Sequence, residues 1–175
     1  PADEMKDILS PREIYAETGI QYHPFNTVYQ LYSDLKAGRL DDATDFLMMP
    51  EYLSYYLTGV KKKEYTNATT GALVDVKTGQ YSEKIIDRLG FPKRLFTPLS
   101  LPSTEVGKLR PEIAKRVGGD LTVVLCASHD TASAVEGVDM PKDGIYISSG
   151  TWSLMGVKAK VAVTDERSEE LGFTN

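Results

Sequence analysis

The stretch from Leu121 to Met155 constrains the fold more than any other part of the chain. Its apolar beginning, Leu121 to Ala127, leads into the polar residues 128–131 and predicts a strand followed by a short helix. A turn comes next, and a second strand leads into the hydroxyl-rich residues 148–151. In α/β proteins ligands bind where strands end. The stretch therefore predicts an α/β fold with ligand-binding residues at its strand ends.

Helical signals dominate the chain before this stretch. Ser10 and Glu13 form a capping-box pattern, which predicts a helix that ends at Gly19. Asn26 is expected to cap a second helix, because apolar residues recur after it at helical spacing. Residues 64–71 carry no clear signal. Further helices are expected to begin at Asp41, to run from Pro50 to a stop at Gly59, and to cover Glu83–Leu89 and Pro111–Val117. The apolar run Phe46–Met49 is expected to be buried.

A mostly helical first part thus precedes a β-rich end. The segment from Pro141 to Gly144 is a strong turn signal between the two. We therefore expect two regions, residues 1–140 and residues 141–175, within a mixed α/β fold.

Composition excludes several classes of protein. The 175 residues carry a net charge of -5, whereas a surface that binds nucleic acid needs an excess of basic residues. No apolar stretch approaches the ~20 residues of a membrane span, and no His/Cys cluster has the spacing of a zinc site. The single cysteine, Cys126, lies in an apolar run and is expected to be buried, in a reducing, cytoplasmic setting.

Asp130 follows the first strand of the 121–155 stretch, and two interpretations of it are open. Aspartate is a preferred helix N-cap, contributing about 1 kcal/mol. A carboxylate there could also be a general base, since the N-terminal end of a helix favours the ionised form. The two roles are compatible. Ser128, His129 and Thr131 could bind sugar hydroxyls beside Asp130, although a structural role for His129 is an alternative.

The turn that contains Ser149, Gly150 and Thr151 also has two interpretations. Its backbone N–H groups and hydroxyls suit a phosphate group, and Gly150 allows close approach of the backbone. The alternative is an ordinary hairpin turn between two strands. The pattern matches neither the Walker loop nor the GxGxxG fingerprint of dinucleotide-binding proteins.

Taken together, these segments resemble the FGGY family of carbohydrate kinases. SHDTASAV is similar to the segment that carries that family's catalytic aspartate, and YISSGTWSLMG is similar to the opening strands of its second domain. TGIQYHPFNTVYQL, MPEYLSYYLTG and the YTNAT stretch resemble its first domain, in members that act on L-rhamnulose. The terminal LGFTN resembles a point at which that family continues. The resemblance covers almost the whole chain.

The resemblance implies an actin/hexokinase-type, ribonuclease-H-like fold that phosphorylates a ketose, L-rhamnulose, with ATP and Mg²⁺. Asp130 matches the proton acceptor. His129 and Thr131 match substrate-binding neighbours. Phe25 and Asn26 lie where family members bring side chains to the sugar, although a core phenylalanine and a helix cap are alternatives for these two residues.

For the nucleotide, the resemblance implies that Ser149, Gly150 and Thr151 contact the phosphates of ATP. It makes residues 1–140 the later part of a first, sugar-binding domain and residues 141–175 the opening strands of a second, ATP-binding domain. The chain is then expected to be an internal fragment that is inactive alone, with sugar and ATP as its partners. A kinase for another sugar, of the xylulose, ribulose or fuculose type, and a non-catalytic binding module of the same fold remain alternatives.

Overall fold

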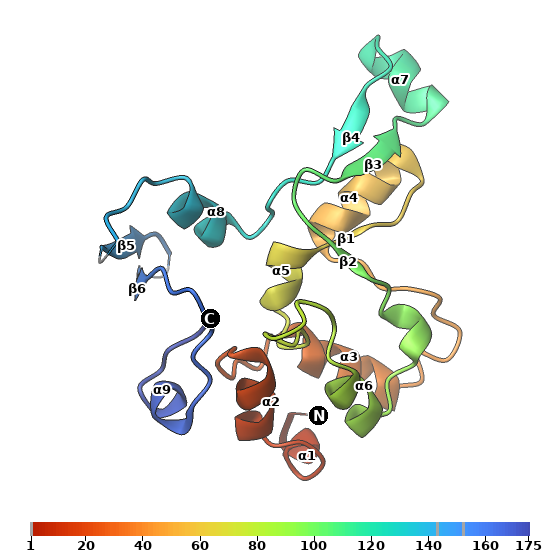
Figure 1. Ribbon diagram of the computed structural model, residues 1–175. Coiled ribbons are helices and arrows are strands. Elements are labelled where there is room, and N and C mark those ends of the chain that lie inside the picture. The colour runs from red at the N-terminus through yellow and green to blue at the C-terminus, as the bar shows by residue number, and fades with distance from the viewer. Residues whose placement is uncertain (1, 143, 152) are drawn as a thin grey trace.

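The computed structural model describes residues 2–142, 144–151 and 153–175 and has a mixed α/β architecture, as expected (Figure 1). The α-helices are α1 (Ala2–Lys6), α2 (Pro11–Thr18), α3 (Thr27–Lys36), α4 (Met49–Thr58), α5 (Tyr65–Thr69), α6 (Glu83–Leu89), α7 (Pro111–Val117), α8 (Asp130–Glu136) and α9 (Glu166–Glu170). A 3₁₀ turn, η1, covers Lys93–Leu95. The strands are β1 (Lys63–Glu64), β2 (Leu99–Ser100), β3 (Glu105–Lys108), β4 (Thr122–Val124), β5 (Ile145–Ser149) and β6 (Ser153–Val157).

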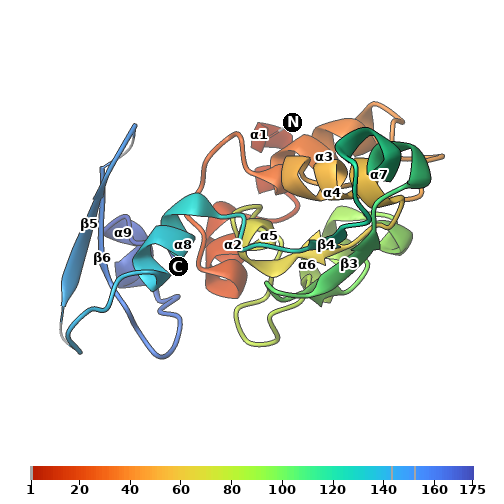
Figure 2. The ribbon, with the colours of Figure 1, turned by 90° about the horizontal axis from the view of Figure 1, so that it is seen from above.

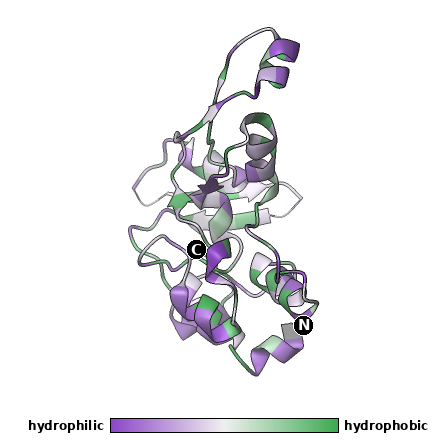
Figure 3. Cartoon of the chain, turned by 90° about the vertical axis from the view of Figure 1, so that its right-hand side faces the viewer, coloured by the Kyte–Doolittle hydropathy of each residue, from purple (hydrophilic) through white to green (hydrophobic). Residues whose placement is uncertain are grey.

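The hydrophobic core lies among α1, α2, α3, α5 and α6 and the segments between them, which we call the body. Its buried residues include Leu9, Ile14, Val28, Leu73 and Ile85, each at most 2% exposed. In Figure 3 the body helices carry hydrophilic and hydrophobic residues on the same helix, as amphipathic helices do. Burial of these apolar faces holds together segments that are far apart in sequence.

Local sequence signals explain where these helices begin and end. The predicted capping box is present on α2: Ser10 Oγ accepts from the Glu13 backbone N–H, and the Glu13 carboxylate accepts from the Ser10 N–H at 2.9 Å. The left-handed backbone at Gly19, with φ 68°, ends the helix. The bounds predicted for α6 and α7 are also confirmed.

Some sequence expectations are wrong. The segment after Asp41 forms turns and extended chain rather than a helix. Phe46 packs against the core but is only half-buried, and Met49 is 68% exposed, so this apolar run is not buried as expected. Cys126 is exposed, because the buried residue of the run is its neighbour Leu125.

The sheets are small. β1 and β2 pair in parallel, whereas β3 with β4 and β5 with β6 pair antiparallel. The strand expected over Leu121–Ala127 is shorter than predicted, since β4 ends at Val124 and the chain continues without regular structure to α8. The two strands predicted after the 141–144 turn are confirmed as the β5–β6 hairpin.

The C-terminal part returns to the body through α9. Arg12 of α2 forms an ion pair with Glu169 at 3.0 Å, and Tyr15 Oη donates to the carbonyl of Phe173 at 3.0 Å. The Asn175 N–H donates to the Gly19 carbonyl at 2.9 Å. Figure 2 shows α8 between the β5–β6 hairpin on one side and α2 and α5 on the other.

Candidate active site at the start of helix α8

The carboxylate of Asp130 is presented by the first turn of α8. The N-cap residue of this helix is His129, whose side chain makes no capping bond, and Asp130 is the first helical residue. The expectation that Asp130 is the N-cap is therefore wrong by one position. Asp130 Oδ1 accepts from the Thr131 N–H at 2.6 Å and lies 3.3 Å from Thr131 Oγ1. The residue is exposed, so its carboxylate is open to a ligand.

The backbone just before Asp130 is tied to the start of α5. Glu64, which is 1% exposed, accepts from the Ser128 N–H at 3.2 Å and from Ser128 Oγ at 2.8 Å. The His129 N–H donates to Thr66 Oγ1 at 3.3 Å. Sequence reasoning missed this connection, because the signal was a lone glutamate in the unassigned 64–71 segment.

A cavity of about 460 Å³ lies beside the start of α8. Two of the predicted site residues, His129 and Thr131, line it, and they come from the α8 side. The start of α5 and the β5–β6 hairpin provide other walls. Among the lining residues are Tyr65, Thr66, Thr69, Tyr146 and Leu154. The structure thus brings the two residues on either side of Asp130 to a cavity between two parts of the fold, although Asp130 itself does not line it.

The predicted phosphate-binding residues lie in the hairpin turn. Ser149 ends β5 and pairs with Ser153, and Gly150 and Thr151 follow in the turn, where both are exposed. None of these three predicted residues lines the 460 Å³ cavity. Their hydroxyls and backbone are accessible, and their contact with a phosphate stays a prediction.

Phe25 and Asn26 precede α3. Phe25 is 58% exposed and stacks on His23, with ring centroids 4.9 Å apart, so the alternative of a core phenylalanine is wrong. Asn26 occupies the N-cap position without a capping bond from its side chain. Instead its Oδ1 accepts from the His23 N–H at 2.7 Å, and its Nδ2 donates to the Thr70 carbonyl at 2.9 Å. Neither residue lines the cavity at α8.

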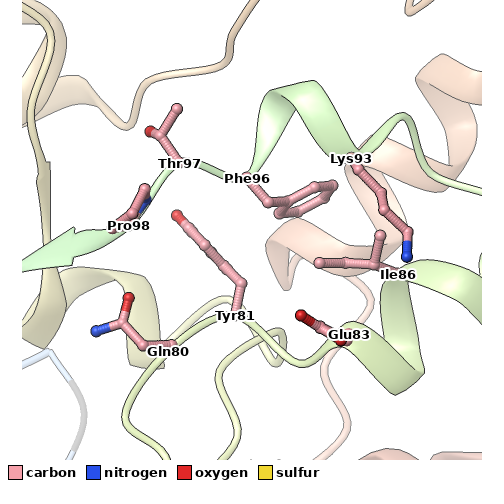
Figure 4. Close-up of a pocket in the computed structure, with 8 residues that line it drawn as sticks. All are labelled: Gln80, Tyr81, Glu83, Ile86, Lys93, Phe96, Thr97 and Pro98. Atoms are coloured by element: carbon pink, nitrogen blue, oxygen red, sulfur yellow. The ribbon is translucent and has the colours of Figure 1, made fainter.

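A second hollow, of about 270 Å³, lies between α6 and the segment after η1 (Figure 4). Gln80, Tyr81, Glu83 and Phe96 are among the residues that line it. The buried hydroxyl of Tyr81 has no hydrogen-bond partner within the described residues. Burial raises the pKa of Tyr81 far above its usual value, so the phenol stays neutral. None of the sequence-predicted site residues lies here.

The described residues contain no group of three or more His, Cys, Asp or Glu side chains that could hold a metal ion. The Mg²⁺ that the resemblance implies is usually bound through one or two carboxylates and the phosphates of the substrate, so it does not require such a cluster. Among the described helices, none has the length and apolar character needed to cross a membrane.

The chain is similar to a known protein family and to several named proteins. The model of the FGGY family of carbohydrate kinases, N-terminal domain, matches residues 2–137. A rhamnulokinase from Oceanobacillus iheyensis is 42% identical over 175 residues, and one from Halalkalibacterium halodurans is 44% identical over 176 residues. These matches cover 99% of this chain but only 37% and 38% of the relatives, so the chain spans little more than a third of their length.

Solved structures of sugar kinases share the fold. The xylulose kinase from Lactobacillus acidophilus matches 88% of this chain and 32% of its own with a TM-score of 0.76 at 22% identity. The xylulose kinase from Rhodospirillum rubrum matches 95% of this chain and 35% of its own with a TM-score of 0.78 at 19% identity. The expected actin/hexokinase-type fold is thus confirmed, and the chain belongs to the FGGY family of carbohydrate kinases.

Proposed function

We propose that the chain acts, as part of a longer protein, in the ATP-dependent phosphorylation of a ketose, L-rhamnulose to L-rhamnulose 1-phosphate. The support for this substrate is the identity of 42–44% to proteins named rhamnulokinase over 99% of the chain. The proposal includes residues 1–140 as part of a sugar-binding domain, residues 141–175 as the opening strands of an ATP-binding domain, and a cytoplasmic location.

The observation that carries the proposed chemistry is the exposed Asp130 carboxylate between two residues that line one cavity. In this mechanism the sugar binds with its acceptor hydroxyl near Asp130. The hydroxyl oxygen attacks the γ-phosphorus of ATP, its proton passes to Asp130, and ADP leaves. His129 and Thr131 hold neighbouring hydroxyls of the sugar. Positioning and electrostatic stabilisation supply most of the rate in phosphoryl transfer.

The hairpin turn is the proposed contact for ATP. Backbone N–H groups and the hydroxyls of Ser149 and Thr151 would donate to phosphate oxygens, and Gly150 would let the phosphate approach the backbone. Mg²⁺, when bound with ATP, would neutralise charge on the phosphates. Phe25 is a candidate contact for the sugar, because its ring is exposed. Asn26, buried with both ends of its amide bonded, would hold the 23–26 segment in shape.

The experiment is a coupled ADP-release assay on the full-length protein with Mg-ATP. The sugars are L-rhamnulose, xylulose, ribulose and fuculose. We expect the highest kcat/KM with L-rhamnulose, and no measurable activity from residues 1–175 alone. A higher kcat/KM with another ketose would show that L-rhamnulose is not the preferred substrate, while the proposed kinase activity would stand. No turnover with any of them, together with retained sugar binding, would favour a non-catalytic binding module.

A further inference from the structure

Glu64 is a buried carboxylate that the proposed mechanism does not use. It is 1% exposed, and the ion pairs among the described residues do not include it. Its neighbour Lys63 pairs with Asp45 instead, at 2.8 Å. A buried charge is costly unless hydrogen bonds satisfy it, so the donors around Glu64 explain how it is tolerated.

Part of the donor set is local. Glu64 Oε1 accepts from the Thr66 N–H at 2.7 Å, while Oε2 accepts from the Asn67 N–H at 3.1 Å and from Thr66 Oγ1 at 2.7 Å. Glu64 is therefore the N-cap of α5. A shorter residue such as serine or aspartate could provide this cap alone.

The rest of the donor set comes from a segment 64 residues away. The same Oε2 atom accepts from the Ser128 N–H at 3.2 Å and from Ser128 Oγ at 2.8 Å. Because the Thr66 hydroxyl donates its proton to Glu64, its lone pair is left to accept from the His129 N–H at 3.3 Å. Of the two successive backbone N–H groups before Asp130, one is thus held by Glu64 and the next by Thr66, whose hydroxyl donates to Glu64. Figures 1 and 2 show the chain passing α5 on its way to α8.

Electrostatics keep this group an acceptor. Burial alone would raise the pKa of Glu64, but the hydrogen bonds from Thr66, Ser128 and Asn67 outweigh burial and hold the pKa below its usual value. The carboxylate is ionised at neutral pH, so both of its oxygens act as acceptors for the surrounding donors. Charge-assisted hydrogen bonds of this kind are stronger than neutral ones and fix geometry.

We infer that Glu64 is a positioning residue, which fastens the 128–129 backbone to the start of α5 and so sets where Asp130 and His129 meet the sugar. The inference rests on the proposed function of Asp130. It needs no contact between Glu64 and the substrate. Small displacements of a reacting group, of the order of 1 Å, can cost about a hundredfold in rate.

The test uses the full-length protein and the substitution Glu64→Gln, which keeps the shape but replaces one accepting oxygen with a donor. We expect kcat to fall about tenfold to a hundredfold, with little change in the KM for ATP. Glu13→Gln is the matched control, because Glu13 also caps a helix by accepting from a backbone N–H and a serine hydroxyl, and it lies in α2. The control should leave kcat unchanged.

A double variant separates positioning from loss of structure. If Glu64 acts through Asp130, Glu64→Gln should add no further loss of kcat to Asp130→Asn. If the two losses multiply instead, the positioning role is overturned. Ser128→Ala removes one of the donors and leaves the cap of α5 intact, so it serves where Glu64→Gln fails to fold. It should show a smaller loss of the same kind, in kcat and not in the KM for ATP.

Amide hydrogen exchange supplies a measurement that does not depend on activity. The N–H groups of Ser128 and His129 should exchange faster in Glu64→Gln than in the unsubstituted protein, and at the same rate in Glu13→Gln. Unchanged exchange at both positions would overturn the anchoring. If the unsubstituted protein shows no sugar-dependent ADP release, the proposed function fails, and the exchange rates decide the anchoring separately.

Discussion

The body and the β5–β6 hairpin carry the same kind of apolar residues with opposite outcomes. In the body, Ile85 is 0% exposed and Leu73 is 1% exposed. In the hairpin, Ile147 and Met155 pair across the strands, and each is 71% exposed. In Figure 2, α8 lies on one side of the hairpin, and no described element lies on the other side.

An apolar pattern can specify a strand without specifying that the apolar side chains of the strand are buried. Alternation of apolar and polar residues specifies a strand, because successive side chains point to opposite faces. Burial needs a second surface, which the body helices provide for each other. The candidate site lies at the border of these two regions, since Glu64 in the body holds the backbone that precedes Asp130.

The largest expected effect is on catalysis and compares two carboxylates at helix starts. In the full-length protein, Asp130→Asn should lower turnover by ~10²–10⁴, the usual contribution of a general base. Asp165 is the matched control: it caps α9 by accepting from the Ser168 N–H at 2.8 Å, with no expected role in the reaction. Asp165→Asn should change turnover by no more than about twofold. Steady-state assays at saturating sugar and Mg-ATP measure both, and near-normal turnover in Asp130→Asn would refute the base.

The second prediction tests burial directly in residues 1–175. Ile85→Ala removes a fully buried side chain and should lower the free energy of unfolding by about 2–5 kcal/mol. Ile147→Ala removes an exposed one and should change it by about 0.5 kcal/mol or less. Urea denaturation, followed by circular dichroism, measures both. Equal losses would mean that the outer face of the hairpin is covered in solution.

Ile85→Ala and Ile147→Ala also test the proposed division into two domains when both substitutions are made in the full-length protein. If residues 141–175 open a second domain, the rest of that domain should cover Ile147, and Ile147→Ala should then cost about as much as a core truncation, about 2–5 kcal/mol. A cost that stays near zero in the full-length protein would argue against that division of the chain.

The third prediction separates the proposed ATP contact from the sugar site. Thr151→Val removes the hydroxyl in the hairpin turn but keeps its β-branched shape. The apparent affinity for ATP should weaken by ~1.5–3 kcal/mol, the value of a hydrogen bond to a charged group, with a smaller change for the sugar. Thr122→Val, at an exposed position of β4, is the control. A change in the sugar constant alone, measured by steady-state kinetics, would make the phosphate role wrong.

The smallest expected effect concerns helix caps, which behave alike in the body and in α9. Hydrogen bonds from the Ser10 backbone and hydroxyl lower the pKa of Glu13, and those from Ser168 lower the pKa of Asp165. A carboxylate whose pKa is lower in the folded state than in the unfolded state contributes its full stabilisation of the fold at pH values above the unfolded-state pKa. This stabilisation is lost as the pH falls through the pKa of the carboxylate in the folded state. Amide chemical shifts of Ser10 and Ser168 should therefore move only below the usual carboxyl range, and movement near neutral pH would contradict both caps.

Much of the local structure follows from sequence alone. The capping box of Ser10 and Glu13, the glycine stops and the hairpin after residue 144 all depend on contacts between residues close in the chain. The segment that carries Asp130 was recognisable for the same reason, since a strand-like run, a polar turn and a helix follow one another directly. The 64–71 segment gave no such signal, because the donors that satisfy Glu64 include residues 64 positions away.

The sequence by itself determined where several helices begin and end, among them α2, α6 and α7, and it predicted the β5–β6 hairpin. It also marked Asp130, His129 and Thr131 as candidates, because propensity, capping and turn chemistry act over a few residues. Only the tertiary structure decided which apolar side chains are buried. It left Cys126 and Ile147 exposed and turned the Asn26 amide toward the Thr70 carbonyl. It also joined Glu64 to Ser128. Burial and these long-range hydrogen bonds depend on packing between elements that are distant in the chain, which local sequence signals do not specify.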